Sequence, residues 1–201
     1  MKRFFVFLFV AFNVILCFAQ ETPEQKDAKR RQFIADFLAT YEAAYESKNI
    51  EYISYFFSDD ALIITETKEL RKTGKEIIVP RTNKSRPYQL MVEDKKEYIK
   101  RLRDVFKSNM SIKLSIAGVK IRQHAKYPEI YGVNFIQSWK YQNEVDNFWE
   151  SQMPGYVFLM IDFKNSEQTP IIHVRTWQPK DNIVNEQDKF FLRDFMIYET
   201  K

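Results

Sequence analysis

Cysteine, histidine and glycine are all scarce in this chain of 201 residues. The single cysteine is Cys17, the two histidines are His124 and His173, and there are four glycines and seven prolines. With one cysteine inside an N-terminal leader, a mature chain would have none, which excludes thiol catalysis and cysteine metal sites. Two distant histidines, one in an expected turn, are a poor ligand set, so no zinc or iron site is expected.

A large excess of charge is missing as well. The chain has 31 lysines and arginines against 27 acidic residues, a net charge of +4 that falls to +2 without Lys2 and Arg3. Such a balance does not indicate a nucleic-acid-binding protein. The sequence also lacks a nucleophile elbow, a phosphate loop and a dinucleotide-binding fingerprint, and no cofactor is expected.

The N-terminus has the pattern of a secretory signal peptide. Lys2 and Arg3 precede an apolar stretch from Phe4 to Leu16, and Cys17 and Ala19 are the small residues before the expected cleavage site. We therefore predict a signal peptide over residues 1–19 and an exported protein in the bacterial periplasm or outside the cell, with no stable membrane span after cleavage. A single-pass anchor is the alternative, although the apolar stretch is short for a bilayer.

Helices are expected in the first half of the chain. An aromatic residue recurs every four positions at Phe33, Phe37, Tyr41 and Tyr45, which predicts an amphipathic helix. Asn49 is suited to a left-handed cap at its end, and a short helix is expected over residues 50–57. Asp94 and Glu97 have the spacing of a capping box, which predicts a second long helix that carries Tyr98 on its apolar face.

Strands are expected in the second half. A long strand from Ile112 changes phase at Ala117-Gly118, which predicts a bulge. In the strand from Tyr131 the odd positions are apolar except for Gln137. Residues 156–163 and 170–179 form an expected hairpin, with the first arm in the middle of the sheet. Helices followed by strands predict an α+β fold, with helices on one face of a curved antiparallel sheet.

Candidate site residues cluster in the hairpin. Asp162 could be a buried general base, or it could pair with Arg175 across the hairpin. His173, Arg175 and Trp177 alternate in the last strand and are expected on one side of it. Arg175 is then placed either to hold a ligand carboxylate beside the indole or to form a structural or subunit contact. The expected ligand-binding residues share an aromatic or polar side chain on a core-facing position: Tyr41, Tyr45, Phe135, Gln137, Trp139, Tyr156, Arg175 and Trp177.

Two motifs and the late strands carry a resemblance to a known family. Tyr41-Glu-Ala-Ala-Tyr45, Phe56-Phe-Ser-Asp-Asp-Ala61 and the strands ending in Trp177 resemble the nuclear transport factor 2-like superfamily, which includes SnoaL-like and ketosteroid-isomerase-like domains. The segment Tyr98–Arg103 and the run His173–Pro179 also resemble a secreted version of this domain from Bacteroidetes. The resemblance covers about Arg31 to Pro179.

The resemblance implies a cone-shaped cystatin-like roll, in which a strongly bent sheet wraps around N-terminal helices. The expected organisation is a signal peptide (1–19), a flexible segment (20–31), the domain itself (32–180) and a C-terminal extension (181–201).

The resemblance carries over no catalytic residue, because neither Asp162 nor His173 matches a known catalytic motif of the superfamily. It indicates little about activity, because this fold hosts isomerases, dehydratases, carriers and interaction domains. The first expectation is a non-catalytic domain that binds a small apolar or amphipathic ligand in the cone, or that binds a protein, with a homodimer through the sheet face as one form. The alternative is a lyase or isomerase with Asp162 as base and His173 or a tyrosine as electrophile.

Overall fold

The computed structural model describes residues 21–67, 75–79, 88–142, 148–152, 154–166 and 168–182. The expected signal peptide and residues 183–201 of the expected C-terminal extension lie outside these ranges. In chain order the elements are α2 (Pro23–Glu46), α3 (Ile50–Tyr55), β1 (Phe57–Thr67), β2 (Lys75–Val79), β3 (Tyr88–Asp94), α4 (Lys95–Ser108), β4 (Ser111–Gln123), β5 (Ile130–Gln142), β6 (Trp149–Ser151), β7 (Gly155–Asp162), β8 (Ile171–Pro179) and the short helix η1 (Lys180–Asn182).

Helix α2 begins earlier than the aromatic periodicity indicated. The Thr22 hydroxyl accepts from the backbone N–H of Gln25, and the Gln25 side chain accepts from the backbone N–H of Thr22, so a capping box starts the helix at Pro23. Residues 23–31, expected to be a flexible segment, are therefore the first turns of α2. At the other end Lys48 takes the left-handed conformation with φ 54°, and Asn49 instead caps α3 by accepting from the backbone N–H of Tyr52.

The strands form one strongly curved, open sheet in the order β2-β3-β1-β8-β7-β5-β4, with β6 paired to β5. The α+β class, the hairpin of β7 and β8, and the central place of β7 are confirmed. The sheet is mixed rather than antiparallel throughout, because β1 runs parallel to β8, whereas the other described strand pairs are antiparallel. The chain between β1 and β8 crosses through α4 and the rest of the sheet, and only such a long crossover can bring two strands together in parallel. Strand β3 was not expected from the sequence.

Bulges in β4 and in β8 shift the side chains of the sheet. In β4 the pairing with β5 shifts between Ala117 and Lys120, and Gly118 has φ 64°, so the predicted bulge is confirmed. In β8 the pairing with β7 shifts at the position of His173, because Ile161 pairs with Ile172 and Met160 pairs with Val174. The second bulge was not predicted, and it decides which side chains of β8 enter the core.

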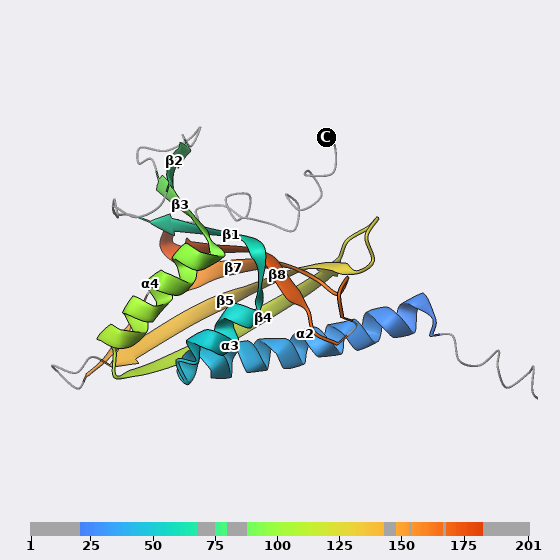
Figure 1. Cartoon of the computed structure of the whole chain (residues 1–201), viewed down its shortest axis with the longest axis horizontal. Helices are drawn as coiled ribbons and strands as arrows, with labels where there is room; N and C mark the ends of the chain where they lie inside the picture. The colour runs from blue at the N-terminus through green and yellow to red at the C-terminus, as the bar shows by residue number, and fades with distance from the viewer. Residues whose placement is uncertain are drawn as a thin grey trace, which may run out of the picture.

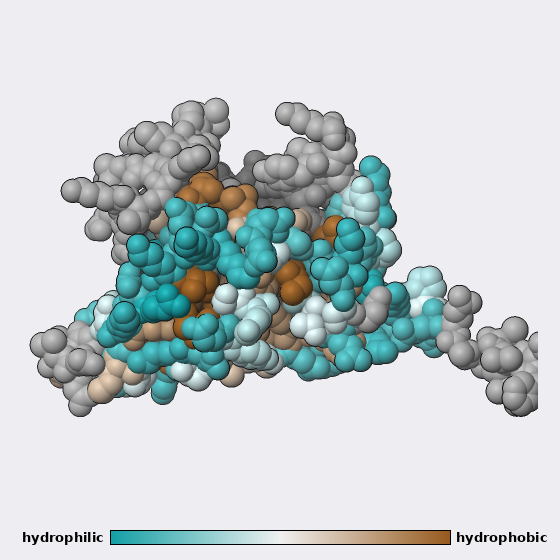
Figure 2. All heavy atoms as spheres, in the orientation of Figure 1, coloured by the Kyte–Doolittle hydropathy of each residue, from teal (hydrophilic) through white to brown (hydrophobic). Residues whose placement is uncertain are grey.

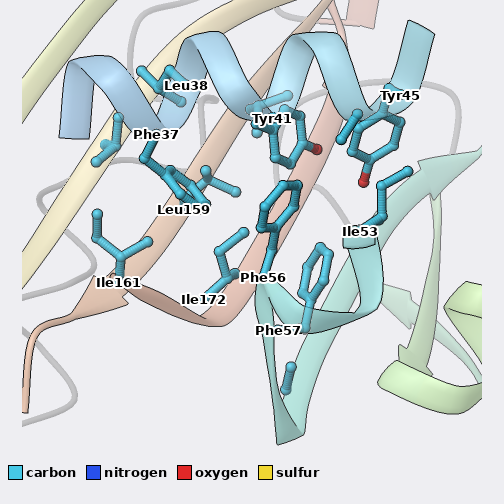
Figure 3. Close-up of a cluster of buried hydrophobic side chains, with 14 of the residues drawn as sticks. Phe37, Leu38, Tyr41, Tyr45, Ile53, Phe56, Phe57, Leu159, Ile161 and Ile172 are labelled. Atoms are coloured by element: carbon cyan, nitrogen blue, oxygen red, sulfur yellow. The ribbon is translucent and has the colours of Figure 1, made fainter. Parts of the chain in front are cut away.

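The core lies between α2 and the concave face of the sheet (Figure 1). Figure 3 shows Tyr41 and Tyr45 projecting from α2 toward Phe56, Leu159 and other buried side chains of α3 and the strands. The rings of Tyr41 and Tyr45 are 4.4 Å apart, and the ring of Tyr41 is 5.8 Å from that of Phe56. The aromatic stripe predicted from the sequence is therefore the face of α2 that packs against the sheet.

Helix α2 also covers the edge strand of the sheet. Arg31 donates to the backbone carbonyl of Ile121, and Glu46 accepts from the backbone N–H of Leu114, both in β4. These contacts satisfy backbone groups that an uncovered edge strand leaves unpaired. They also hold α2 against β4, the last strand of the sheet.

The described surface on the face shown in Figure 2 is mainly hydrophilic. In Figure 2 teal residues cover α2 and α4, and the brown patches are small and lie between the helices and over the strands. In the described part of the chain, no helix combines the length and the apolar character that crossing a membrane requires.

Candidate functional site

Five polar side chains from four elements meet inside the cone. Tyr41 and Tyr45 come from α2, Tyr98 from α4, Gln137 from β5 and Arg175 from β8. Arg175 donates through Nε to the Tyr41 hydroxyl at 3.2 Å and through Nη2 to Oε1 of Gln137 at 3.4 Å. The hydroxyls of Tyr45 and Tyr98 are 2.5 Å apart. We call these five residues the inner polar cluster.

Local sequence rules explain how the cluster is assembled. Tyr41 and Tyr45 are one helical turn apart, so they lie on the same face of α2. The capping box of Asp94 and Glu97 starts α4 so that Tyr98 lies on its buried face. Arg175 pairs with Leu159 in β7, a core residue, and this register turns the guanidinium toward the helices.

The cluster holds one positive charge. Arg175 is 5% exposed, and its guanidinium carbon lies 5.5 Å from the ring centroid of Tyr98. A guanidinium stays protonated in proteins. Its two hydrogen-bond acceptors, a phenol and an amide, are neutral, and no described carboxylate forms an ion pair or hydrogen bond with it. The charge therefore has no partner of opposite sign among the described residues.

The buried phenols are hydrogen-bonding groups rather than bases at neutral pH. Burial raises the pKa of Tyr98 to about 12, against a usual value of 10.0. Burial also raises the pKa of Tyr45 well above its ordinary value, and the neighbouring Tyr41 and Tyr98 act in the same direction. Both phenols therefore keep their protons at neutral pH, and the cluster offers donors rather than a general base.

Gln137 is the member of the cluster whose side chain leaves a hydrogen-bond donor unpaired. Its side chain is fully buried, and its Nε2 has no hydrogen-bond partner. Two partly buried tryptophans lie near it. Trp139 is two residues further along β5, with its ring 5.5 Å from that of Tyr45. Trp177 lies over Gly155, the residue of β7 that pairs with Gln137, so closely that a Cβ at Gly155 would overlap the indole.

Most of the expected ligand-binding residues come together on the inner face. Tyr41, Tyr45, Gln137 and Arg175 belong to the inner polar cluster, and Phe135, Trp139 and Trp177 pack against the same core. Tyr156 is the exception. It alternates with the core residue Val157 and pairs with Ile136 and Gln178, so its side chain is on the opposite face of the sheet.

Asp162 and His173 meet, but outside the cone. His173 Nε2 lies 2.6 Å from Asp162 Oδ2, and His173 Nδ1 lies 3.7 Å from Asp60 Oδ1. The side chains of His173 and Asp162 are 31% and 13% exposed. The expected pair of Asp162 with Arg175 is wrong, and so is the expectation that His173 shares a side with Arg175. The bulge at His173 turns this side chain to the convex face, where Asp162 lies.

Tyr98 was not predicted as a site residue. The capping box placed it on a buried helix face, but a tyrosine among apolar residues usually belongs to the core, and nothing local showed that its hydroxyl would meet Tyr45.

A separate depression of about 480 Å³ lies between α3, β1 and α4. None of the cluster residues lines it, and its lining is mainly basic: Ser54, Asp59, Lys95, Lys96, Ile99, Lys100 and Arg103. Lys95 is already engaged there, since it donates to Asp59 and to the carbonyl of Phe57. Within the described ranges no three His, Cys, Asp or Glu side chains come together as a metal site would require.

Neither a family model nor a curated protein matches this sequence. Solved structures do match. A candidate scytalone dehydratase from Novosphingobium aromaticivorans has a TM-score of 0.59 and 8% identity, over 78% of this chain and 88% of that one. The β subunit of a candidate aromatic-ring-hydroxylating dioxygenase from the same organism has a TM-score of 0.53 and 18% identity, over 72% of this chain and 85% of that subunit. ActVI-ORFA from Streptomyces coelicolor has a TM-score of 0.54 and 6% identity, over 75% of this chain and 97% of that protein.

This chain has the nuclear transport factor 2-like fold. The fold expected from the resemblance is thus confirmed. That the protein is a secreted member from Bacteroidetes stays a prediction. Identities this low show the fold alone. Since the similar structures include both a candidate enzyme and a subunit of a larger assembly, the fold leaves catalysis and binding open.

Proposed function

We propose that this protein is a non-catalytic binding domain for a small amphipathic molecule, held at the inner polar cluster of its nuclear transport factor 2-like cone. The observation that carries the proposal is the fully buried amide of Gln137, whose Nε2 has no partner. Leaving a buried donor unpaired costs about 1–3 kcal/mol, so such a group usually indicates a missing acceptor. A ligand acceptor at Nε2 supplies one.

The tryptophans beside Gln137 define the rest of the ligand. Trp139 and Trp177 are partly exposed aromatic surfaces at the edge of the buried core. Aromatic side chains around a few polar groups are the usual composition of a small-molecule site. An apolar body between the two indoles, with an acceptor directed at Gln137, matches this arrangement.

The chemistry of the cluster favours binding over catalysis. The phenols of Tyr45 and Tyr98 stay protonated at neutral pH, and no carboxylate or histidine among the described residues forms a hydrogen bond with the cluster. A lyase or isomerase with Asp162 as its general base is the alternative proposal. It has less support, because Asp162 bonds His173 on the convex face, away from the aromatic lining.

Native mass spectrometry of the mature chain, from Gln20 onward and purified without denaturation, tests the proposal. We expect a mass above that of the chain, and we expect Trp177→Leu to lose it. Trp149→Leu is the matched control, since Trp149 is an exposed tryptophan on β6. The proposal is wrong if both variants keep the extra mass. It is also wrong if the wild type has no extra mass and its tryptophan fluorescence does not respond to 2-naphthamide or 2-naphthoate.

A homodimer through the sheet face is a second proposal. Leu62, Val174 and Met160 are neighbours in the register of β1, β8 and β7 on the convex face, and Leu62 is 40% exposed. Arg175 has no part in such a contact because it is buried under the helices. Leu62→Asp should convert a dimer to a monomer in native mass spectra, and a wild-type monomer would end this proposal.

Export is a further proposal, and it rests on the N-terminal pattern alone. The test is the N-terminal sequence of protein recovered from the periplasm or the medium of bacteria that express the full chain. We expect it to begin at Gln20, and recovery of only the full-length chain would contradict cleavage after Ala19.

A further inference from the structure

We infer that the ligand of the inner polar cluster carries a carboxylate, which Arg175 and Gln137 bind together. This inference rests on the binding function proposed above and names the chemical class of the ligand. Two independent observations carry it. One is a buried guanidinium without a counter-charge, and the other is a buried amide donor without an acceptor, joined to it by a hydrogen bond.

The first observation stands out against another arginine in the same protein. Arg101 forms hydrogen bonds of 2.6, 2.7 and 3.0 Å with the buried carboxylate of Glu93. Arg175 is itself buried, yet its hydrogen-bond acceptors are the neutral side chains of Tyr41 and Gln137. An ion taken out of water without an opposite charge is costly, and a bound anion removes that cost.

The second observation gives the anion its position. Oε1 of Gln137 accepts from Arg175, and this bond fixes the orientation of the amide, because the reverse orientation would set two donors against each other. Nε2 is then a free donor beside the guanidinium. A carboxylate has two oxygens and accepts from two donors at once, so it suits this pair.

The charge and the surroundings limit the ligand further. The cluster carries one positive charge, so a monoanion balances it, while a phosphate dianion would leave buried negative charge. The body beyond the carboxylate meets Trp139 and Trp177, which are partly buried aromatic rings. The ligand class is therefore a monocarboxylic acid with an aromatic or aliphatic body.

The experiment compares 2-naphthoate with 2-naphthamide, a neutral probe of nearly the same shape, by calorimetry and tryptophan fluorescence on the mature chain. We expect wild type to bind the carboxylate about 10-fold more tightly or better, the range for a charge-assisted hydrogen bond. Arg175→Met should bind the two probes equally. Asp162→Asn, which changes a carboxylate on the convex face, should keep the wild-type preference.

Gln137→Glu is the decisive variant, because it places a carboxylate beside Arg175 within the chain itself. We expect a higher melting temperature and loss of naphthoate binding, since the internal carboxylate takes the place of the ligand's. If circular dichroism shows that the Gln137→Glu protein is unfolded, the binding of the two probes by Arg175→Met decides whether the ligand carries a carboxylate. Equal binding of both probes by wild type would overturn the carboxylate while leaving a binding domain intact. If wild type binds neither probe, the inference of a carboxylate ligand is wrong. If, in addition, native mass spectra show no ligand retained on the chain, the proposed binding function is wrong as well.

Discussion

His173 and Arg175 are two residues apart in β8 and face opposite sides of the sheet. Ile172 pairs with Ile161, and Arg175 pairs with Leu159; all four residues are buried. The bulge between the two pairs turns the side chain of His173 to the convex face. There its Nε2 contacts a carboxylate oxygen of Asp162, while Arg175 donates a hydrogen bond to the Tyr41 hydroxyl beneath α2. One extra residue in a strand thus separates a histidine–aspartate contact on the outside of the cone from a cationic centre inside it.

Arg175 and Arg101 should respond differently to the same substitution, because Arg175 is buried without a described counter-charge and Arg101 is paired with the buried carboxylate of Glu93. Arg175→Met removes a cation that has no described counter-charge, so the free energy of unfolding of ligand-free protein should stay within about 1 kcal/mol of wild type. Arg101→Met leaves the buried carboxylate of Glu93 unpaired and should cost about 3 kcal/mol. Urea unfolding of protein refolded without ligand measures both. Equal losses would mean that the charge of Arg175 is balanced within the fold.

Stability should fall at alkaline pH because of the buried phenols. The pKa of Tyr98 is raised by burial to about 12 in the folded state, against about 10 in an unfolded chain. Below pH 10 both states hold the proton. Between pH 10 and 12 the unfolded chain loses its proton first, which favours unfolding by on the order of 2 kcal/mol for this group.

Tyr98→Phe should make that alkaline loss of stability smaller, as measured by urea unfolding from pH 9 to 12. Tyr55→Phe, which changes an exposed phenol, is the matched control. An unchanged slope in Tyr98→Phe would show that this phenol ionises as easily in the folded protein as in the unfolded one.

Gly155 is required because Trp177 lies directly over it. Its Cβ in Gly155→Ala would overlap the indole and force it to move, at a cost of about 1–3 kcal/mol and with a shift in tryptophan fluorescence. Gly118→Ala is the control. It has open space around the new Cβ but a φ of 64°, so it should cost about 1–2 kcal/mol without the spectral shift. The same spectral shift in both variants would rule out a close contact at Gly155.

Asp162→Asn distinguishes the convex-face pair from the cone. The variant weakens a partly exposed contact with His173, so we expect a loss of about 1 kcal/mol or less. Binding of 2-naphthoate should stay within twofold of wild type. A loss of binding would place the site on the convex face. Should a substrate be identified, unchanged turnover by Asp162→Asn would end the proposal that Asp162 is a general base.

The sequence alone determined those features that depend on neighbours along the chain. The four-residue spacing from Phe33 to Tyr45 predicted the buried face of α2, because helical periodicity places such residues on one side. Asp94 and Glu97 predicted the start of α4, since a capping box is made within one turn. The change of phase at Gly118 predicted the bulge in β4. Together these patterns indicated helices packed on a curved sheet.

Only the tertiary structure decided which side chains face the cone. Strict alternation put His173 beside Arg175 and Tyr156 among the lining residues, yet the bulge in β8 and the register of β7 place both side chains on the convex face. The parallel pairing of β1 with β8 and the meeting of Tyr98 with Tyr45 join segments far apart in the chain. Alternation has a period of two, so a shift of one residue exchanges the two faces, and that shift is set by pairing between strands rather than by local sequence.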